Sequence, residues 1–216
     1  MEGPEHAPLR PFDIDDVLAR VREADRSFPK PVLFALADDG FRSVFEQLAA
    51  CVISIRTLEE VTEPAARSLF VRARTPAAVA ALSVEEIDAL IGRSTFHEAK
   101  ARQIREIARR ALSEHGGEVP CDEGVLRSFA GVGPKCANLV LAIACGVPRI
   151  GVDTHVHRVV NRWGYVSAST PERTLSALEG RLPRRHWTDL NRLLVPFGKH
   201  VCTGHLPCCS TCPVRD

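Results

Sequence analysis

The stretch LRSFAGVGPKCAN, residues 126–138, sets two helical patterns around a Gly-Val-Gly turn. Gly131 and Gly133 have no Cβ, so the backbone can turn tightly there and leave main-chain N–H groups at a helix start free to bind a phosphate. Pro134 suits the first helical position, where its missing N–H costs nothing. The segment predicts two helices joined by a turn, with Gly131, Val132 and Gly133 as a candidate anion-binding backbone.

Lys135 follows inside the second helix of this segment. The partial positive charge of a helix N-terminus disfavours a cation and tends to lower the pKa of an amine placed there. A lysine at this position is therefore better suited to act as a nucleophile than to stabilise the helix. An ordinary helical corner with a solvated lysine is the alternative, and the segment alone does not decide between them.

A second segment, IGVDTHVHRVVNRWG at 150–164, places Asp153 where an apolar run becomes a helical pattern. An aspartate at a helix entrance is often only an N-cap, worth about 1 kcal/mol. The pair of strings GVGPKCAN and VDTHVHRVVNR at this spacing, however, resembles the endonuclease III family of helix-hairpin-helix DNA glycosylases. The resemblance runs from about Phe41 to Cys212.

The resemblance implies that Lys135 is the catalytic lysine and Asp153 the catalytic aspartate. It implies a bifunctional DNA glycosylase and AP lyase that removes oxidised pyrimidines from double-stranded DNA and nicks the abasic site through a Schiff base. His155 would contact the flipped nucleotide or simply cap and pack. The implied fold is all-α with two domains: a six-helix barrel over 37–149, holding the hairpin at about 122–146, and a helical cluster domain formed by 1–36 and 150–216.

Two further positions match places where the family separates base pairs. Arg56, in Ser54-Ile55-Arg56, stands where the family typically has a glutamine that fills the hole left by the flipped nucleotide. Phe96 stands where the family has an apolar wedge. A surface salt bridge for Arg56 and a core position for Phe96 are the alternatives. The arginine leaves the range of lesions and the opposite-base preference open.

The eight cysteines fall into two groups. Cys51, Cys121, Cys136 and Cys145 are scattered, and in a cytosolic protein such residues are expected to be small buried side chains. Four others crowd the C-terminal loop: Cys202, Cys208, Cys209 and Cys212.

Crowded thiols at such spacing are typical of metal or iron–sulfur ligands. The family loop, C-x6-C-x2-C-x5-C, matches Cys202, Cys209 and Cys212 and implies a [4Fe–4S] cluster. The fourth ligand would fall at 218, so we expect either a longer natural chain, Cys208 as substitute, or an incomplete or absent cluster. Zinc, with His200 or His205, is the competing metal.

Composition agrees with a globular protein and adds little on its own. Of the 216 residues, 45% are hydrophobic and 25% charged, with a net charge of +1. Residues 149–216 hold ten Lys and Arg against five Asp and Glu, which favours DNA only weakly. The sequence contains no apolar run of membrane-spanning length and no signal-peptide core, so we expect a cytoplasmic, nucleoid-associated monomer.

Apolar residues recur at helical spacing and no segment alternates like a strand. Helices are predicted over Ile14 to Ala24, Phe41 to Ile55, Leu58 to Ala73, Ile104 to Leu112 and Leu139 to Ala144. Helix starts are predicted at Thr75-Pro76, at Ser83 with Glu86, and at Thr170-Pro171. Helix ends are predicted at His115-Gly116-Gly117 and at Cys145-Gly146.

Two alternative functions compete with this hypothesis. A monofunctional adenine or mispair glycosylase of the same superfamily generally lacks the motif lysine, so Lys135 argues against it. A non-catalytic DNA-binding or redox-sensing protein would need neither Lys135 nor Asp153.

Overall fold

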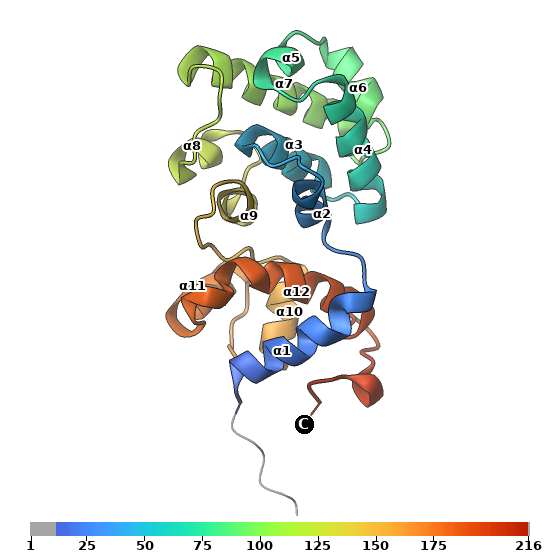
Figure 1. Ribbon diagram of the computed structural model, residues 1–216, viewed down its shortest axis with the longest axis vertical. Coiled ribbons are helices and arrows are strands. Elements are labelled where there is room, and N and C mark those ends of the chain that lie inside the picture. Colours follow the sequence, from blue (N-terminus) through green and yellow to red (C-terminus); the bar gives the residue numbers. More distant parts are fainter. Residues whose placement is uncertain (1–11, 216) are drawn as a thin grey trace, which may run out of the picture. The chain divides into compact units, whose positions relative to one another are not determined.

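The computed structural model describes residues 12–215, and within that range helices are the only regular secondary structure (Figure 1). The α-helices are α1 (Ile14–Ala24), α2 (Val32–Asp38), α3 (Val44–Ser54), α4 (Glu59–Arg72), α5 (Pro76–Ala80), α6 (Val84–Ile91), α7 (His97–Glu114), α8 (Glu123–Ser128), α9 (Pro134–Ala144), α10 (Thr154–Arg162), α11 (Pro171–Arg181) and α12 (Trp187–His200). The prediction of an all-α chain is confirmed.

Local capping chemistry sets the helix starts where the sequence predicts them. The Ser83 hydroxyl accepts from the Glu86 N–H at 3.1 Å while the Glu86 carboxylate accepts from the Ser83 N–H at 2.7 Å, a complete capping box. Thr75 and Thr170 cap α5 and α11 through the hydroxyl alone, which accepts a first-turn N–H bond in each helix. Each prediction is confirmed because a cap depends only on residues three positions apart.

Other helix bounds differ from the periodic pattern. Helix α7 begins seven residues before Ile104, at His97, because its first turns carry mostly polar residues that hide the period. Helix α9 begins at Pro134, five residues before the periodic pattern at Leu139 and at the first helical position that the hairpin motif predicts. The pattern missed α2, which is short and buried over most of its residues, and α12, which contains Pro196.

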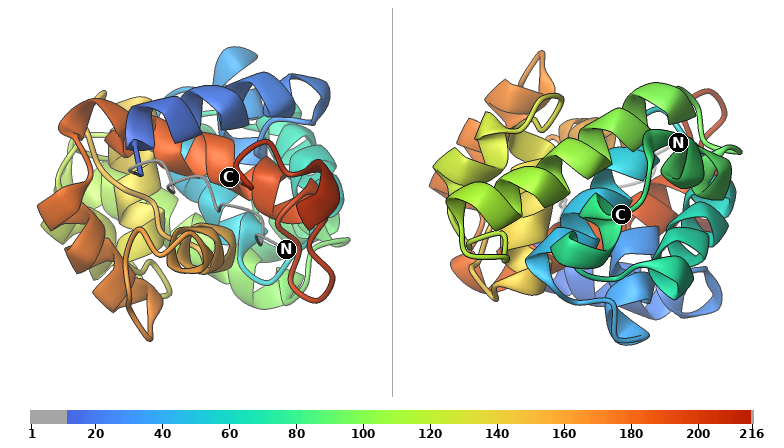
Figure 2. Two further views of the ribbon diagram at one scale, coloured as in Figure 1. Left: turned by 90° about the horizontal axis from the view of Figure 1, so that it is seen from below. Right: turned by 90° about the horizontal axis from the view of Figure 1, so that it is seen from above.

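The chain divides into two compact units. The central unit comprises 30–151 and 183–192, and the terminal unit comprises the described residues before 30 together with 152–182 and those from 193 on. Within the central unit α3 packs against α4, α7 and α9, and α7 packs against α5 and α6 (Figure 2). The core of the central unit includes fully buried Leu48, Ile53, Leu69, Phe70, Ile104 and Leu126.

The scattered cysteines differ from expectation, because the structure joins them in two disulfides. Cys51 of α3 bonds Cys136 of α9, with their Cα atoms 6.1 Å apart, and Cys121 bonds Cys145, with Cα atoms 6.0 Å apart. Sequence separations of 85 and 24 residues gave no sign of these pairs, which arise from helix packing. The second disulfide closes the segment that holds α8 and α9.

The part of α12 from residue 193 on packs closely against α10 within the terminal unit. A Cβ added at Gly198 would come within 2.9 Å of both Cβ and Nδ1 of His155, so this position requires glycine for contact. Arg20 of α1 donates to the carbonyl of Pro213 at 3.0 Å, which ties α1 to the C-terminal segment. None of the described helices combines the length and apolar character needed to cross a membrane.

Candidate functional site

The hairpin between α8 and α9 is the first candidate DNA-contacting element. Gly131 has φ +77°, in the left-handed region that favours glycine, whereas Gly133 is extended at φ −89° and acts as the N-cap of α9. The N–H groups of these two glycines donate to no acceptor within the described part of the chain. Val132 differs: its side chain is buried in the core, and its N–H donates to the Phe129 carbonyl at 3.1 Å.

Helix α7 holds this hairpin from one side. The Gln103 amide donates to the Ala130 carbonyl, and a Cβ added at Gly131 would lie 2.8 Å from Gln103 Nε2. About two turns further along α7, Arg110 donates to the Ser128 hydroxyl at 3.1 Å. Its guanidinium carbon lies 4.6 Å from the centroid of the Phe129 ring. Neither residue was predicted from the sequence, because Gln103 pairs with a backbone carbonyl and the partners of Arg110 lie 18 and 19 positions along the chain.

Lys135 lies in the first turn of α9, immediately after the turn and Pro134. It is half-buried, and it belongs to the central unit. Its neighbour Cys136 is buried in the disulfide with Cys51, so the backbone that carries Lys135 is anchored to α3. The lysine is therefore presented from a fixed helix start.

Asp153 belongs to the terminal unit and is the N-cap of α10, as one of the two sequence-based interpretations predicts. Its Oδ1 accepts from the N–H groups of His155 and Val156, each at 2.9 Å. Both bonds end on the same oxygen, so capping occupies only one side of the carboxylate. A capping role and a chemical role are thus compatible for Asp153.

His155 is held within the terminal unit. Arg158 Nη2 lies 3.2 Å from His155 Nδ1 and donates to the Gly198 carbonyl at 2.7 Å. Burial lowers the pKa of His155; the charges of Arg158 and Lys199 lower it further, whereas the Asp153 charge and a hydrogen bond with the Gly198 backbone oppose this. This environment favours a neutral imidazole that packs between α10 and α12.

Arg56 and Phe96 come together in the central unit although forty residues separate them. The guanidinium carbon of Arg56 lies 6.0 Å from the Phe96 ring centroid. Both residues have left-handed backbones, with φ of 52° and 59°, and they are the positive-φ non-glycine residues of the described chain. Phe96 is 60% exposed, so it is not a core aromatic. Strained, exposed positions of this kind concentrate at functional sites.

The C-terminal loop carries Cys202, Cys209 and Cys212, the three cysteines at the family spacing, as free thiols. Burial raises the pKa of the Cys212 thiol, and the neighbouring Cys202 and Cys209 thiols raise it further. Arg162 Nη1 lies 3.6 Å from Cys202 Sγ and Nη2 donates to the Gly204 carbonyl at 2.8 Å. In residues 12–215, no three Cys, His, Asp or Glu side chains form a group arranged to hold a metal ion.

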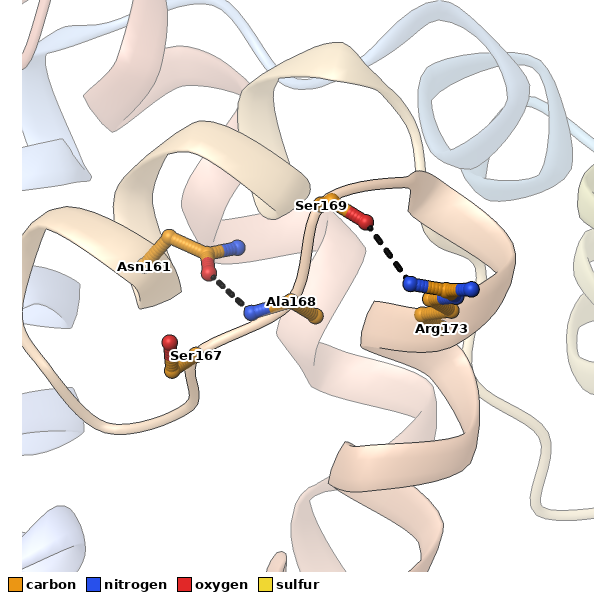
Figure 3. Close-up of a pocket in the computed structure, with 5 residues that line it drawn as sticks. All are labelled: Asn161, Ser167, Ala168, Ser169 and Arg173. Carbon is orange, nitrogen blue, oxygen red and sulfur yellow. Dashed lines mark hydrogen bonds between the residues drawn. The ribbon is translucent and has the colours of Figure 1, made fainter.

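A surface cavity of about 490 Å³ lies in the terminal unit, between the end of α10 and the start of α11 (Figure 3). Asn161 accepts from the Ala168 N–H at 2.8 Å, and Arg173 donates to the Ser169 hydroxyl at 3.2 Å. Ser167 completes its lining. The residues predicted from the sequence do not line it, so this cavity is not the predicted site.

Comparison with known proteins identifies the family of the chain. Residues 49–184 match the model of the HhH-GPD superfamily base excision DNA repair proteins. Endonuclease III of Thermotoga maritima is 40% identical over 80% of this chain and 81% of its own, and endonuclease III of Escherichia coli K12 is 33% identical over 93% and 92%.

Solved structures agree with the sequence comparison. A non-covalent endonuclease III–DNA complex matches with a TM-score of 0.81 and 29% identity, over 93% of this chain and 91% of its own. A trapped endonuclease III–DNA covalent intermediate matches with a TM-score of 0.80 at the same identity and coverage. The chain therefore belongs to the endonuclease III family and is a base excision repair DNA glycosylase.

Proposed function

We propose that this glycosylase is bifunctional, removing oxidised pyrimidines from double-stranded DNA and then nicking the abasic site. The observation that carries the proposal is the place of Lys135, half-buried at the start of α9 directly after the hairpin turn. A primary amine presented beside a phosphate-binding turn can reach a sugar whose phosphate the turn holds. The matched solved complexes include a covalent intermediate between endonuclease III and DNA, which supports an amine nucleophile.

In the proposed reaction the neutral Lys135 amine attacks the sugar C1′ and the damaged base leaves with the bonding electron pair. Ring opening converts the adduct to a Schiff base, which acidifies the C2′ proton. Loss of that proton forms a C2′–C3′ double bond and expels the 3′ phosphate. Hydrolysis of the remaining imine then frees Lys135.

We assign Asp153 the role of the carboxylate that accepts a proton from the lysine or stabilises positive charge on the sugar. Its capping bonds keep Oδ1 fixed at the start of α10. The N–H groups of Gly131 and Gly133 bind a DNA phosphate, with Val132 anchoring the turn in the core. Arg56 fills the space that the flipped nucleotide leaves, and Phe96 acts as the apolar wedge between the neighbouring bases.

An iron–sulfur cluster is typical of the family, and we propose Cys202, Cys209 and Cys212 as its thiolate ligands here. Support for the proposal comes from the donor set: three thiols have the family spacing, Arg162 Nη1 donates to Cys202 Sγ at 3.6 Å, and burial followed by the Cys202 and Cys209 thiols raises the pKa of Cys212. When bound, the cluster would cross-link the loop. The proposal assigns it no step in base excision.

Borohydride trapping on duplex DNA that contains thymine glycol or an abasic site tests the function. The wild-type protein is expected to form a covalent adduct, and Lys135→Gln is expected to form none while binding the same DNA with similar affinity, because the phosphate contacts are backbone N–H groups. Normal nicking by Lys135→Gln would show that another amine is the nucleophile. Excision without any adduct would instead indicate a monofunctional glycosylase.

A further inference from the structure

Lys100, in the first turns of α7, places an ammonium group inside the central unit. The residue is only 4% exposed. Its Nζ donates to the backbone carbonyls of Ile53 and Ile55, each at 2.7 Å, and to the Thr57 hydroxyl at 2.8 Å. Three donors thus meet three acceptors from one short stretch at the end of α3.

These acceptors explain why a cation is needed. The last carbonyls of a helix have no intrahelical partner and carry the negative end of the helix dipole. An ammonium has three N–H donors, whereas a neutral amine has two. All three partners are uncharged oxygens, so no carboxylate offsets the burial, which lowers the pKa of Lys100 to about 8. Many helices end instead at a glycine, where backbone N–H groups bond the last carbonyls and no charged group has to be buried.

The same contacts link the end of α3 to the turn before α7. Thr57 accepts from the Thr95 N–H at 3.1 Å, so the Thr57 hydroxyl receives bonds from both Lys100 and Thr95. Arg56 and Phe96 are the direct neighbours of these two threonines, and both have left-handed backbones. The bonds of Lys100 therefore fix the two strained positions relative to each other, with Arg56 against the Phe96 ring.

We propose that Lys100 is a positioning residue that locks the Arg56 and Phe96 turns into one rigid wedge, so that both side chains enter the duplex together. The inference rests on the proposed function, because it assumes that these two side chains separate the bases. Lys100 itself touches no DNA; it acts through the backbone at Ile53, Ile55 and Thr57. On a DNA substrate in which no base pair has to be opened, the reaction rate should not depend on this wedge.

The test compares two substrates: duplex DNA with thymine glycol, and a single strand with a preformed abasic site. Lys100→Met keeps the length of the side chain and removes the ammonium. We expect it to slow duplex excision by about a hundredfold, the loss typical of a reacting group displaced by about 1 Å, while borohydride trapping on the single strand stays within about twofold of wild type. Arg109→Met, which removes an exposed cation of the same helix, is the matched control and should change neither rate.

Thr57→Val covers the case in which Lys100→Met fails to fold. It removes the hydroxyl between Lys100 and Thr95, with its own bond to the Ile55 carbonyl, and leaves the ammonium on the Ile53 and Ile55 carbonyls. It should reproduce the duplex-specific loss. In a double-mutant cycle, the added loss from Lys100→Met should largely disappear in a Phe96→Ala background. If Lys100→Met acts through a general effect on folding, its loss in excision rate should instead multiply with the loss caused by Phe96→Ala.

Equal losses on both substrates for Lys100→Met and Thr57→Val, or full additivity with Phe96→Ala, would overturn the positioning role. Failure of the proposed function looks different. If Phe96→Ala and Arg56→Ala excise from duplex DNA at the wild-type rate, these side chains are not the wedge, whatever Lys100 does. Fluorescence of 2-aminopurine beside the lesion reports the same distinction, since only wild type and Arg109→Met should unstack it.

Discussion

Asp153→Asn separates the two roles of the residue that caps α10. Oδ1 of Asp153 accepts both capping bonds, and an asparagine carbonyl oxygen can accept the same two N–H groups. The substitution therefore keeps the cap and removes the charge. Asp153→Ala, as the comparison variant, removes both.

The magnitudes follow from these contacts. Loss of the favourable charge at the half-buried helix start costs about 0.3–1 kcal/mol of unfolding free energy in Asp153→Asn. Loss of the whole cap costs about 0.5–2 kcal/mol more in Asp153→Ala. For a chain of this size, 1 kcal/mol corresponds to a Tm change of roughly 2–4 °C. If the carboxylate takes part in the chemistry, both variants should lose about three orders of magnitude in excision rate, a loss within the range for a removed charge-stabilising or proton-transfer group.

The assay is a single-turnover rate of base release from duplex DNA, measured beside the melting temperature of each variant. Nearly equal rates for Asp153→Asn and Asp153→Ala, with clearly different Tm values, would support the chemical role. The reasoning is refuted if Asp153→Asn excises at close to the wild-type rate while Asp153→Ala loses stability and activity in parallel. In that case Asp153 is only a cap.

A buried carboxylate and the proposed metal site offer two further, independent tests. Both carboxylate oxygens of Asp25 are buried without a hydrogen-bond partner in the described chain, and burial raises its pKa from 3.8 to about 7. Protonated Asp25 therefore favours the folded state below about pH 4, and this contribution is lost as pH rises through about 7. At pH 8 Asp25→Asn should raise the free energy of unfolding by on the order of 1 kcal/mol, after allowance for partial exposure, and so raise Tm, whereas at pH 4 it should change neither. For the metal site, Cys209→Ser should remove iron from anaerobically purified protein while Cys208→Ser leaves it, and the reverse result, or zinc without iron, would contradict the ligand assignment.

Short-range features of this fold are predictable from sequence. The capping box of Ser83 and Glu86, the cap at Asp153 and the left-handed turn at Gly131 each depend on a few consecutive residues, and the structure has all three. Gly133 lies at the helix start as predicted, but it does not have the left-handed backbone of Gly131. It is an extended N-cap, and a Cβ added there would meet no atom within 4 Å. The fold itself therefore leaves room for a side chain at Gly133.

Long-range features were not predictable. The Cys51–Cys136 disulfide joins helices whose packing no local pattern specifies. Lys100 and Gln103 were also missed, because each pairs with backbone carbonyls, and a carbonyl is present at every residue whatever its side chain. A lysine and a glutamine at positions i and i+3, next to buried Ala101 and Ile104, were the available signal.

These missed residues lie on one helix face, since Lys100, Gln103 and Arg110 follow helical spacing along α7. Lys100 binds the end of α3, Gln103 the hairpin turn, and Arg110 the end of α8. Phe96 is itself the N-cap residue of α7. Every DNA contact proposed in the central unit is thus carried by a loop or helix end, and each of those ends is tied to the same rigid helix. Because a loop is positioned only as precisely as the elements that hold it, we expect the proposed DNA contacts of the central unit to depend on α7 as well as on the contacting side chains.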